Sequence, residues 1–323
     1  MVIGSFNYSG TEARYAACEE DFSLSLFFLL IETILQDTAS KEYMRRSIAF
    51  LLALAATLIG CASLDERQRE WIFQPSDRSW WRGAEAAAGM TDVWVDFQSR
   101  ETGEAVKLHG LWLAHASFAD QPAAPVLLYL HGARFNVEGS AFRARRMQEL
   151  GFSVLAIDYR GFGKSTKALP SESMAYEDAR AAWDWLAKQY PDRPRYIFGH
   201  SLGGAIAIEL ASQVTDEQGT LVEGTFTSIP DVVRIHKWGW LPVGALITQR
   251  FEAVKRVANI GSPLLVVHGQ ADTLIAPELG KRLFDAATGR KAFVLVPGGS
   301  HHNTNLVGQE QYRAALSDLF GLR

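Results

Sequence analysis

A five-residue segment of the chain, GHSLG at 199–203, has the residue types and spacing of an activated serine nucleophile. It follows an apolar run at 196–198 and precedes a second apolar run, which together predict a strand, a sharp turn and a helix. Gly199 and Gly203 provide the small bulk that such a turn needs, and the turn lifts the Ser201 hydroxyl above the strand end. This context predicts a nucleophilic serine, and the alternative is a structural serine in a helix cap.

A serine hydroxyl is a weak nucleophile at neutral pH and needs a base to accept its proton. Asp272 comes directly after a predicted buried strand, where its carboxylate is free to orient an imidazole. It could instead be only a turn or cap residue. The glycine-rich loop after the last predicted strand contains two adjacent histidines. Counting from Pro297 favours His301 as the base, with His302 as the alternative.

Acyl transfer also needs backbone N–H groups that face the oxygen on which negative charge develops. One expected donor is the N–H of Leu202, directly after the nucleophile. The second is expected in the loop HGAR that follows an apolar run at 126–130, and Ala133 is the predicted donor. In the same loop, His131 is interpreted as structural. Arg134 is interpreted as a surface side chain, with contact to an anionic substrate group as the alternative.

The elements that must position these residues are short β-rich runs that alternate with helical patterns from residue 90 onward. This alternation is typical of an α/β fold with a mainly parallel sheet. Runs at 93–97 and 108–114 come first without a helix between them and are expected to form an antiparallel pair. Further strands are expected at 126–130, 153–158, 196–198, 221–227, 264–268 and 292–296, and helices at 139–150, 173–189, 202–213, 278–287 and 310–320.

The stretch 230–259 interrupts this alternation. It contains Trp238 and Trp240, with Pro242 and Gly244 as helix breakers. The stretch is too short for a separate domain. Its aromatic side chains would either line an acyl pocket or pack in the core.

The chain resembles the α/β-hydrolase superfamily through five segments in order: HGAR at 131–134, DYRGFGKS at 158–165, GHSLGG at 199–204, HGQADTLIAP at 268–277 and PGGSHHN at 297–303. Over residues 70–323 it is most similar to the compact, membrane-associated branch that contains protein depalmitoylases and assorted esterases. The resemblance implies a mostly parallel sheet of about eight strands flanked by helices, with a small cap. It implies neither a metal nor an organic cofactor. The doubled histidine departs from the pattern of that branch.

The N-terminal region contains a segment typical of a secretory signal. From Met44 it reads MRRSIAFLLALAATLIGCASL, with two arginines, an apolar run of 13 residues at 48–60, and then Cys61. The run is short for a membrane-spanning helix, which needs about 20 residues. Its end resembles a bacterial lipobox, in which Cys61 becomes the lipid-modified first residue. An uncleaved apolar helix is the alternative.

This interpretation predicts an upstream extension at 1–43 outside the fold, a signal peptide at 44–60, a linker or anchor segment at 61–89, and a hydrolase domain at 90–323 with its cap at about 230–259. Removal of the signal would leave 323 − 60 = 263 residues, which suits one domain. Lipid on Cys61 would anchor the protein to a membrane rather than span it. Ala62 follows the cysteine, which by resemblance to Gram-negative lipoproteins favours the outer membrane of the bacterial cell envelope, facing the periplasm.

Charge and cysteine content exclude other classes of partner. The formal net charge of −4 argues against nucleic acid, because phosphate binding needs an excess of clustered Lys and Arg. The cluster Arg143, Arg145 and Arg146 falls in a predicted helix and is interpreted as a solvated face, with an anion site as the alternative. Two cysteines, Cys18 and Cys61, are too few for a zinc site or a disulfide framework.

The leading functional hypothesis is hydrolysis of a carboxylic ester or thioester through an acyl-enzyme on Ser201. The substrate would be a small-molecule or lipid-linked acyl compound, and no oligomeric state is predicted. Serine peptidases share this triad and fold, but they usually carry an extra domain that restricts access, and the sequence shows none. The third hypothesis is a lipoprotein that keeps the fold but acts as a binding module without catalysis.

Overall fold

The computed structural model describes residues 41–76, 83–235 and 243–322, apart from the side chains at 41–45, 52–62 and 243. The chain divides into two units, residues 1–64 and 65–323. The strands are β1 (Thr91–Gln98), β2 (Ala105–Leu113), β3 (Val126–Leu130), β4 (Ser153–Ile157), β5 (Arg195–His200), β6 (Glu217–Glu223), β7 (Leu264–Gly269) and β8 (Lys291–Val296). The α-helices are α2 (Lys41–Phe73), α3 (Gly83–Ala87), α4 (Ala141–Glu149), α5 (Glu172–Gln189), α6 (Leu202–Ala211), α7 (Ile229–Ile235), α8 (Ala253–Arg256), α9 (Pro277–Ala286), α10 (Thr304–Val307) and α11 (Gln309–Phe320). Short 3₁₀ helices are η1 (Ala116–Phe118), η2 (Glu138–Ser140), η3 (Val243–Leu246) and η4 (Val257–Asn259).

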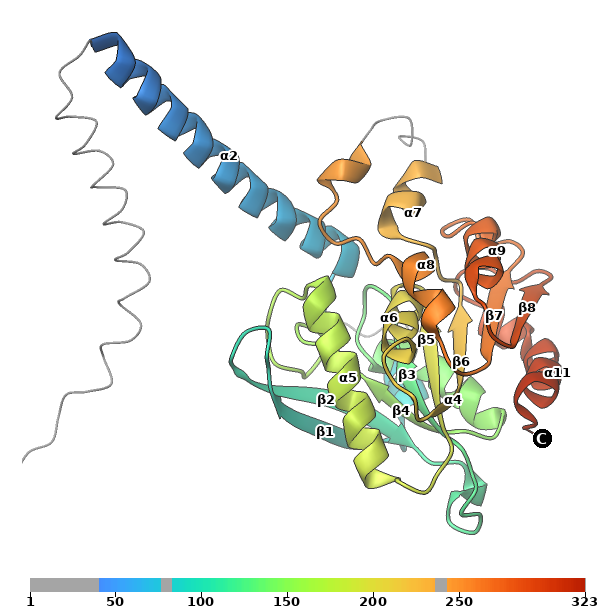
Figure 1. Ribbon diagram of the computed structural model, residues 1–323. Helices are drawn as coiled ribbons and strands as arrows, with labels where there is room; N and C mark the ends of the chain where they lie inside the picture. Colours follow the sequence, from blue (N-terminus) through green and yellow to red (C-terminus); the bar gives the residue numbers. More distant parts are fainter. Residues whose placement is uncertain (1–40, 77–82, 236–242, 323) are drawn as a thin grey trace, which may run out of the picture. The chain divides into compact units, whose positions relative to one another are not determined.

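The strands form one eight-stranded sheet in the order β1-β2-β4-β3-β5-β6-β7-β8. The pairs β1–β2 and β2–β4 are antiparallel, and every later pair is parallel. A mostly parallel sheet of this kind, flanked by helices (Figure 1), confirms the predicted fold class. The expected antiparallel opening pair is β1 and β2.

The strand β3 shows why the sequence folds in this way. All five of its residues are apolar and buried, as expected for a strand that is covered on both faces. Val126, Leu128 and Leu130 pack in the same core as residues of α5, α6 and α9. Leu127 and Tyr129 point to the other face and pack with residues of α4 and α11. The alternation of successive side chains thus divides the core into two layers.

The strand β6 ends earlier than the sequence suggested. A strand was expected at 221–227, but β6 ends at Glu223 because Gly224 has a positive φ of 57°. A Cβ atom at Gly224 would lie 3.4 Å from the Asp272 carboxylate and 3.4 Å from Nδ1 of His301. A Cβ atom here would make ordinary van der Waals contacts with both groups, so it is the backbone conformation that favours glycine at this position.

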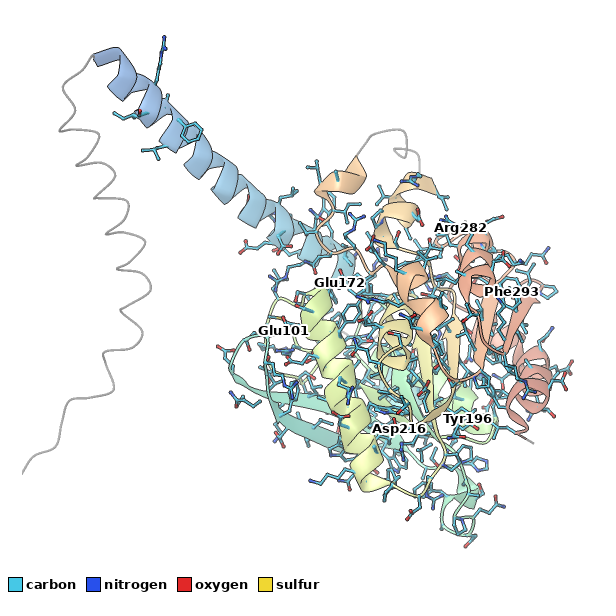
Figure 2. All side chains as sticks on the ribbon, in the orientation of Figure 1. Glu101, Glu172, Tyr196, Asp216, Arg282 and Phe293 are labelled. Carbon is cyan, nitrogen blue, oxygen red and sulfur yellow. The ribbon has the colours of Figure 1, made fainter. Side chains whose placement is uncertain are left out.

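The segment in which a cap was expected contains α7, η3, α8 and η4. Residues 236–242, with Trp238 and Trp240, lie outside the described residues. Glu172, at the N-terminal end of α5 (Figure 2), binds this segment to the sheet layer. Its carboxylate accepts hydrogen bonds from the backbone N–H groups of Arg250 at 2.6 Å and Phe251 at 2.9 Å.

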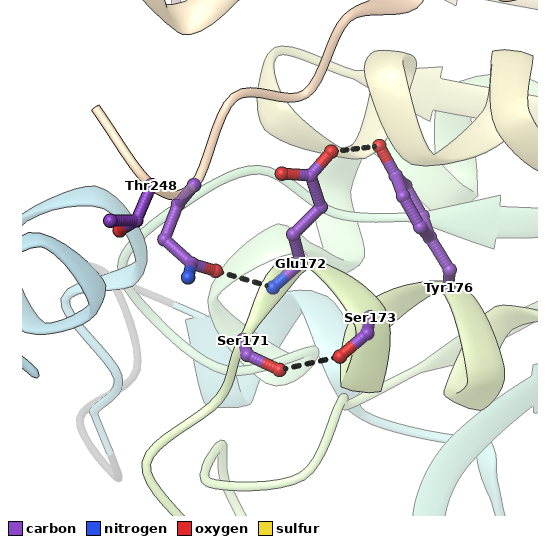
Figure 3. Close-up of a pocket in the computed structure, with 6 residues that line it drawn as sticks. Ser171, Glu172, Ser173, Tyr176 and Thr248 are labelled. Carbon is purple, nitrogen blue, oxygen red and sulfur yellow. Dashed lines mark hydrogen bonds between the residues drawn. The ribbon is translucent and has the colours of Figure 1, made fainter. Parts of the chain in front are cut away.

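A cavity of about 350 Å³ lies at this joint (Figure 3). The Tyr176 hydroxyl donates to the Glu172 carboxylate at 2.8 Å, and the Glu172 N–H donates to the Gln249 side chain at 2.7 Å. Ser171 caps α5 by accepting from the N–H of Met174 at 3.2 Å. Since its polar groups bond to one another, we interpret this cavity as a structural joint.

Residues 65–73 of α2 belong to the same unit as the sheet. Asp65 accepts hydrogen bonds from the Thr248 hydroxyl at 2.7 Å and the Gln249 amide at 2.8 Å. Arg69 donates to the carbonyl of Pro170 at 3.0 Å. Phe73 is fully buried and packs edge-on against Phe251, with ring centroids 5.7 Å apart. Residues 65–76, which were expected to be part of a linker, are therefore packed against the cap segment and the core.

The predictions for the N-terminal region concern residues that are only partly described. Residues 1–40 lie outside the described part of the chain. Cys61 lies within α2, but its side chain is not among the described ones. Among the helices that the structure describes, none is long and apolar enough to cross a membrane. The signal peptide, the lipid on Cys61 and the envelope location remain predictions.

Candidate active site

The predicted nucleophile occupies a sharp turn between β5 and α6. Ser201 has φ 55° and ψ −120°, a strained conformation for a residue with a side chain. A Cβ at Gly199 would lie 2.2 Å from the Gly203 carbonyl oxygen, and one at Gly203 would lie 2.1 Å from the Leu130 carbonyl oxygen. Only glycine fits at these two positions, which explains the spacing of the motif.

A continuous hydrogen-bonded chain joins the three predicted catalytic residues. The Nε2 atom of His301 lies 3.0 Å from the Ser201 hydroxyl, and its Nδ1 atom lies 2.8 Å from Oδ2 of Asp272. An ionised carboxylate can only accept, so Nδ1 carries a proton and donates to Asp272. In the neutral imidazole, Nε2 is then the acceptor and the Ser201 hydroxyl donates to it. This arrangement can take a proton from the serine and keep the resulting imidazolium paired.

Asp272 is held as a carboxylate by several donors. Its Oδ1 atom accepts from the backbone N–H groups of Leu274 at 2.9 Å and Ile275 at 2.8 Å. Burial alone would raise its pKa, but hydrogen bonds from His268 and His301 outweigh burial and hold the pKa below the usual aspartate range. Asp272 is therefore ionised at neutral pH.

The structure brings His301, rather than His302, to the Ser201 hydroxyl. His301 is buried, whereas the neighbouring His302 is exposed and lines the cavity in front of the serine. Burial of part of the ring, followed by the nearby His301 and Arg143, lowers the pKa of His302. His302 is thus placed to contact a substrate.

The two predicted oxyanion donors both line the same cavity as Ser201. Leu202 is the first residue of α6, where a backbone N–H has no acceptor within the helix. Ala133 follows Gly132, and a Cβ at Gly132 would lie 3.1 Å from the Cβ of Ser201. The loop after β3 is therefore pressed against the nucleophile, as an oxyanion site requires. The donor roles themselves remain predictions.

The end of this loop has a strained backbone, and a hydrogen bond to the last residue of α2 holds it in place. Arg134 and Phe135 both have positive φ angles, 65° and 52°. Such angles are uncommon for residues with side chains. The N–H of Arg134 donates to the carbonyl of Phe73 at 2.9 Å. The end of α2 therefore fixes the loop that carries Ala133.

The Ser201 hydroxyl opens into a cavity of about 380 Å³. Its apolar wall consists of Trp71, Ile72, Phe142, Phe226, Ile229, Val232, Leu274 and Ile275. Trp71 and Ile72 come from the end of α2, and the sequence analysis missed them because they precede the expected domain. The sequence feature that could have indicated a buried or lining role is the pair of large apolar residues itself, which follows a charged stretch at 65–70.

Arg143 is not on a solvated face, so that prediction was wrong. Its side chain is buried, and its Nε atom donates to the buried Glu223 carboxylate at 3.1 Å. Its Nη2 atom donates to the carbonyls of His301 at 3.0 Å and His302 at 3.2 Å. Arg145 is also engaged, since it donates to the carbonyl of Ala86 at 2.5 Å. The spacing from Arg143 to the buried Met147, one helical turn, was the signal that placed Arg143 on the inner face.

Glu223 connects the turn of Ser201 to the loop of His301. Its backbone carbonyl accepts from the N–H of Ser201 at 2.9 Å, while its side chain binds Arg143 and accepts from the Tyr312 hydroxyl at 2.6 Å. Arg143 in turn binds the backbone of His301. One buried residue therefore supports both the serine turn and, through Arg143, the histidine loop.

The nearby His200 stays neutral in this network. Burial, followed by the Arg143 charge, lowers its pKa well below the ordinary histidine value. Nε2 of His200 lies 3.0 Å from Nη2 of Arg143 and 3.0 Å from the carbonyl oxygen of His301. The network therefore contains one cation and one carboxylate, which neutralise each other.

We expect Arg143→Lys to lower kcat about 10- to 100-fold with KM changed less than about twofold. A lysine ammonium cannot bridge Glu223 and two carbonyls at once, so the histidine loop would lose its fixed position. Steady-state kinetics and thermal unfolding would be measured together, because loss of a buried ion pair also destabilises the fold, by about 3 to 5 kcal/mol when one partner is removed. Arg146→Lys, on the exposed side of α4, is the matched control.

Guanidinium rescue separates positioning from folding. In a folded Arg143→Ala protein, millimolar guanidinium is expected to restore part of kcat. If kcat per folded molecule is unchanged in Arg143→Lys, the positioning role of Arg143 is wrong.

The sheet, the sharp serine turn and the hydrogen-bonded serine and histidine define an α/β-hydrolase. Residues 121–250 match the family described as "Serine aminopeptidase, S33". Over 243 residues the chain is 33% identical to an uncharacterised protein of Mycobacterium tuberculosis, a match that covers 75% of this chain and 83% of that protein. The chain belongs to the α/β-hydrolase superfamily and is a serine hydrolase of that fold.

Curated relatives with a printed activity match over a shorter region. Lysophosphatidylserine lipase ABHD12 of Danio rerio is 32% identical over 192 residues, which cover 53% of this chain and 50% of that protein. The corresponding protein of Gallus gallus is 30% identical over 188 residues, which cover 52% of this chain and 49% of that protein. The chain thus spans about half the length of these lipases.

Solved structures share the fold. An esterase of Pyrococcus furiosus superposes with a TM-score of 0.59 at 19% identity, covering 77% of this chain and 97% of that one. The enzyme Est1E of Butyrivibrio proteoclasticus, bound to ferulic acid, superposes with a TM-score of 0.57 at 18% identity, covering 71% and 99% of the two chains. At these identities the likeness establishes the architecture.

Proposed function

We propose that this protein hydrolyses a carboxylic ester or thioester of a lipid-like acyl compound, with Ser201, His301 and Asp272 as its catalytic triad. The observation that carries the proposal is the hydrogen-bonded chain from Ser201 through His301 to Asp272, which opens into a largely apolar cavity. An activated serine beside an apolar wall suits an ester whose acyl portion is a hydrocarbon chain.

The reaction proceeds through an acyl-enzyme. The Ser201 oxygen attacks the carbonyl carbon as His301 Nε2 takes its proton, and Asp272 stabilises the imidazolium. The N–H groups of Leu202 and Ala133 donate to the tetrahedral oxyanion. Collapse breaks the bond to the alcohol or thiol, which leaves with the proton from His301. Water, deprotonated by the same imidazole, then attacks the acyl-enzyme and releases the acid and free Ser201.

Two further features support a lipid-like substrate. Trp71 and Leu274 line the cavity although 77% and 46% of their surfaces are exposed, so the apolar wall reaches the solvent boundary. An apolar rim of this kind suits a substrate that leaves a micelle or bilayer. The ABHD12 relatives are lipases by name. We propose further that a lipid on Cys61 anchors the enzyme in the bacterial cell envelope.

The test is a panel of substrates for the full chain, with p-nitrophenyl esters of rising acyl length, matched thioesters, a monoacylglycerol and an aminoacyl p-nitroanilide. We expect hydrolysis of esters and thioesters, with kcat/KM rising from the acetyl to the octanoyl compound because longer chains bury more apolar surface. Mass mapping of a fluorophosphonate adduct is expected to locate Ser201.

The other hypotheses have their own outcomes in this panel. Faster cleavage of the anilide than of any ester would overturn the esterase proposal and favour the peptidase activity that the name of the matched family suggests. A folded protein that neither turns over any substrate nor forms an adduct would favour the binding module.

A further inference from the structure

We propose that Arg134 forms a subsite for an anionic group on the alcohol portion of the substrate, so that the enzyme prefers negatively charged single-chain lipids. The inference rests on the proposed ester hydrolysis and adds a charge preference to it. The juxtaposition that carries it is an exposed arginine in the wall of the largely apolar cavity in front of Ser201.

The charge of the cavity wall has one sign. Among the described residues that line the cavity there is no aspartate or glutamate, and the two fully charged side chains are Arg134 and Arg143. The charge of Arg143 is compensated by Glu223, which lies 3.1 Å away. The uncompensated charge of the wall is therefore that of Arg134.

The Arg134 guanidinium is available to a ligand. No carboxylate of the described residues lies within 4.0 Å of it, whereas most of the other arginines at the surface are paired, as Arg146 is with Glu149 at 2.8 Å. The charge nevertheless acts on the site, since Arg134 is one of the groups that lower the pKa of His302, after burial, His301 and Arg143. A guanidinium at a cavity mouth binds phosphate or carboxylate oxygens through two parallel N–H groups.

The backbone presents this side chain in a constrained way. Arg134 has φ 65°, and its N–H is fixed by the Phe73 carbonyl at 2.9 Å. Glycine would adopt such a backbone with less strain, yet this position carries the longest cationic side chain. Arg134 directly follows Ala133, a predicted oxyanion donor, and lines the same cavity as Ser201.

The direction of the substrate follows from burial. The apolar wall contains buried side chains such as Phe226, 2% exposed, and Ile275, 5% exposed. A hydrocarbon acyl chain is stabilised against that part of the wall. With the scissile carbonyl at Ser201, the alcohol portion then extends toward the exposed side, where Arg134 lies. A phosphate on the alcohol portion meets the guanidinium, whereas a neutral glycerol does not.

The test compares two substrates with the same acyl chain, lauroyl lysophosphatidylglycerol and monolauroylglycerol, each below its micelle concentration. Wild-type enzyme is expected to show a kcat/KM about 10-fold higher for the anionic lipid than for the neutral ester, and Arg134→Gln is expected to bring the ratio of these two kcat/KM values close to one. Arg134→Lys is expected to retain part of the preference, and higher salt to reduce it. Arg313→Gln, an exposed arginine on α11, is the matched control.

A lauroyl ester with a carboxylate on its alcohol portion identifies the ligand chemistry. Equal gains with phosphate and carboxylate assign the subsite to negative charge in general, and a gain with phosphate alone assigns it to phosphate. Equal loss for the charged and neutral substrates in Arg134→Gln would overturn the subsite, because a merely structural role would affect both.

Binding separates failure of the subsite from failure of the proposed function. In Ser201→Ala protein, calorimetry with lauroyl lysophosphatidylglycerol is expected to show binding that weakens about 10-fold when Arg134→Gln is added. If no ester is turned over, this arm still decides the subsite. If both esters are turned over but the added substitution leaves binding unchanged, the subsite is wrong and the proposed function stands.

Discussion

Replacement of Ser201 by alanine is expected to reduce ester hydrolysis by at least about 10⁴-fold and to abolish the fluorophosphonate adduct. The loss is large because no atom is left to form the acyl-enzyme, although the predicted oxyanion donors and the cavity remain. KM for the residual activity and the affinity for substrate are expected to change little, since among the described residues the hydroxyl forms its hydrogen bond with His301.

The control for this substitution is Ser212→Ala. Ser212 lies directly after α6, and its hydroxyl donates to the Glu209 carbonyl at 2.7 Å, away from the cavity. Thermal unfolding of both variants should match that of the wild-type protein. If Ser201→Ala retains more than about a tenth of the activity in a folded sample, Ser201 is not the nucleophile.

The second large effect separates the two adjacent histidines. His301→Ala is expected to lower kcat by about 10⁴-fold or more, whereas His302→Ala is expected to lower it by less than about 10-fold. The reason is geometric, because the ring of His301 bridges Ser201 and Asp272 while that of His302 lies exposed at the cavity wall.

These two variants are well matched. Arg143 binds the backbone carbonyls of both histidines, so loss of either side chain leaves the loop held in the same way. Rates of acylation in a stopped-flow burst, together with unfolding curves, would measure the effect. A greater loss in His302→Ala than in His301→Ala would reverse the assignment of the base.

The sequence allowed the fold and the proximity of Ser201, Asp272 and His301 to be predicted for a common reason. Strands that are buried on both faces are continuous apolar runs, so β3, β5 and β7 were visible without tertiary information. The loops that follow parallel strands emerge at the same edge of a sheet. Ser201 follows β5, Asp272 follows β7 and His301 follows β8, so their meeting is a consequence of strand order.

The residues that the sequence did not reveal depend on contacts between distant segments. A charged side chain on a helix is ordinarily solvated, and Arg143 is buried only because Glu223, from another strand, neutralises it. The end of β6 depended on a single glycine with a positive φ, which local apolar character did not indicate. The wall formed by Trp71 and Ile72 requires α2 to pack against the cap segment, which no periodicity of α2 predicts.

The packing of the end of α2 fixes the rotation of this part of the helix about its own axis. Asp65 is bound to the cap segment and Phe73 to the loop that carries Ala133, with Trp71 between them on the cavity wall. Successive helical residues are rotated by about 100°, so deletion of one residue between Asp65 and Trp71 would turn the indole away from the cavity or release Phe73. The spacing of these residues is therefore constrained as tightly as that of the serine motif, and the catalytic unit begins well before its first strand.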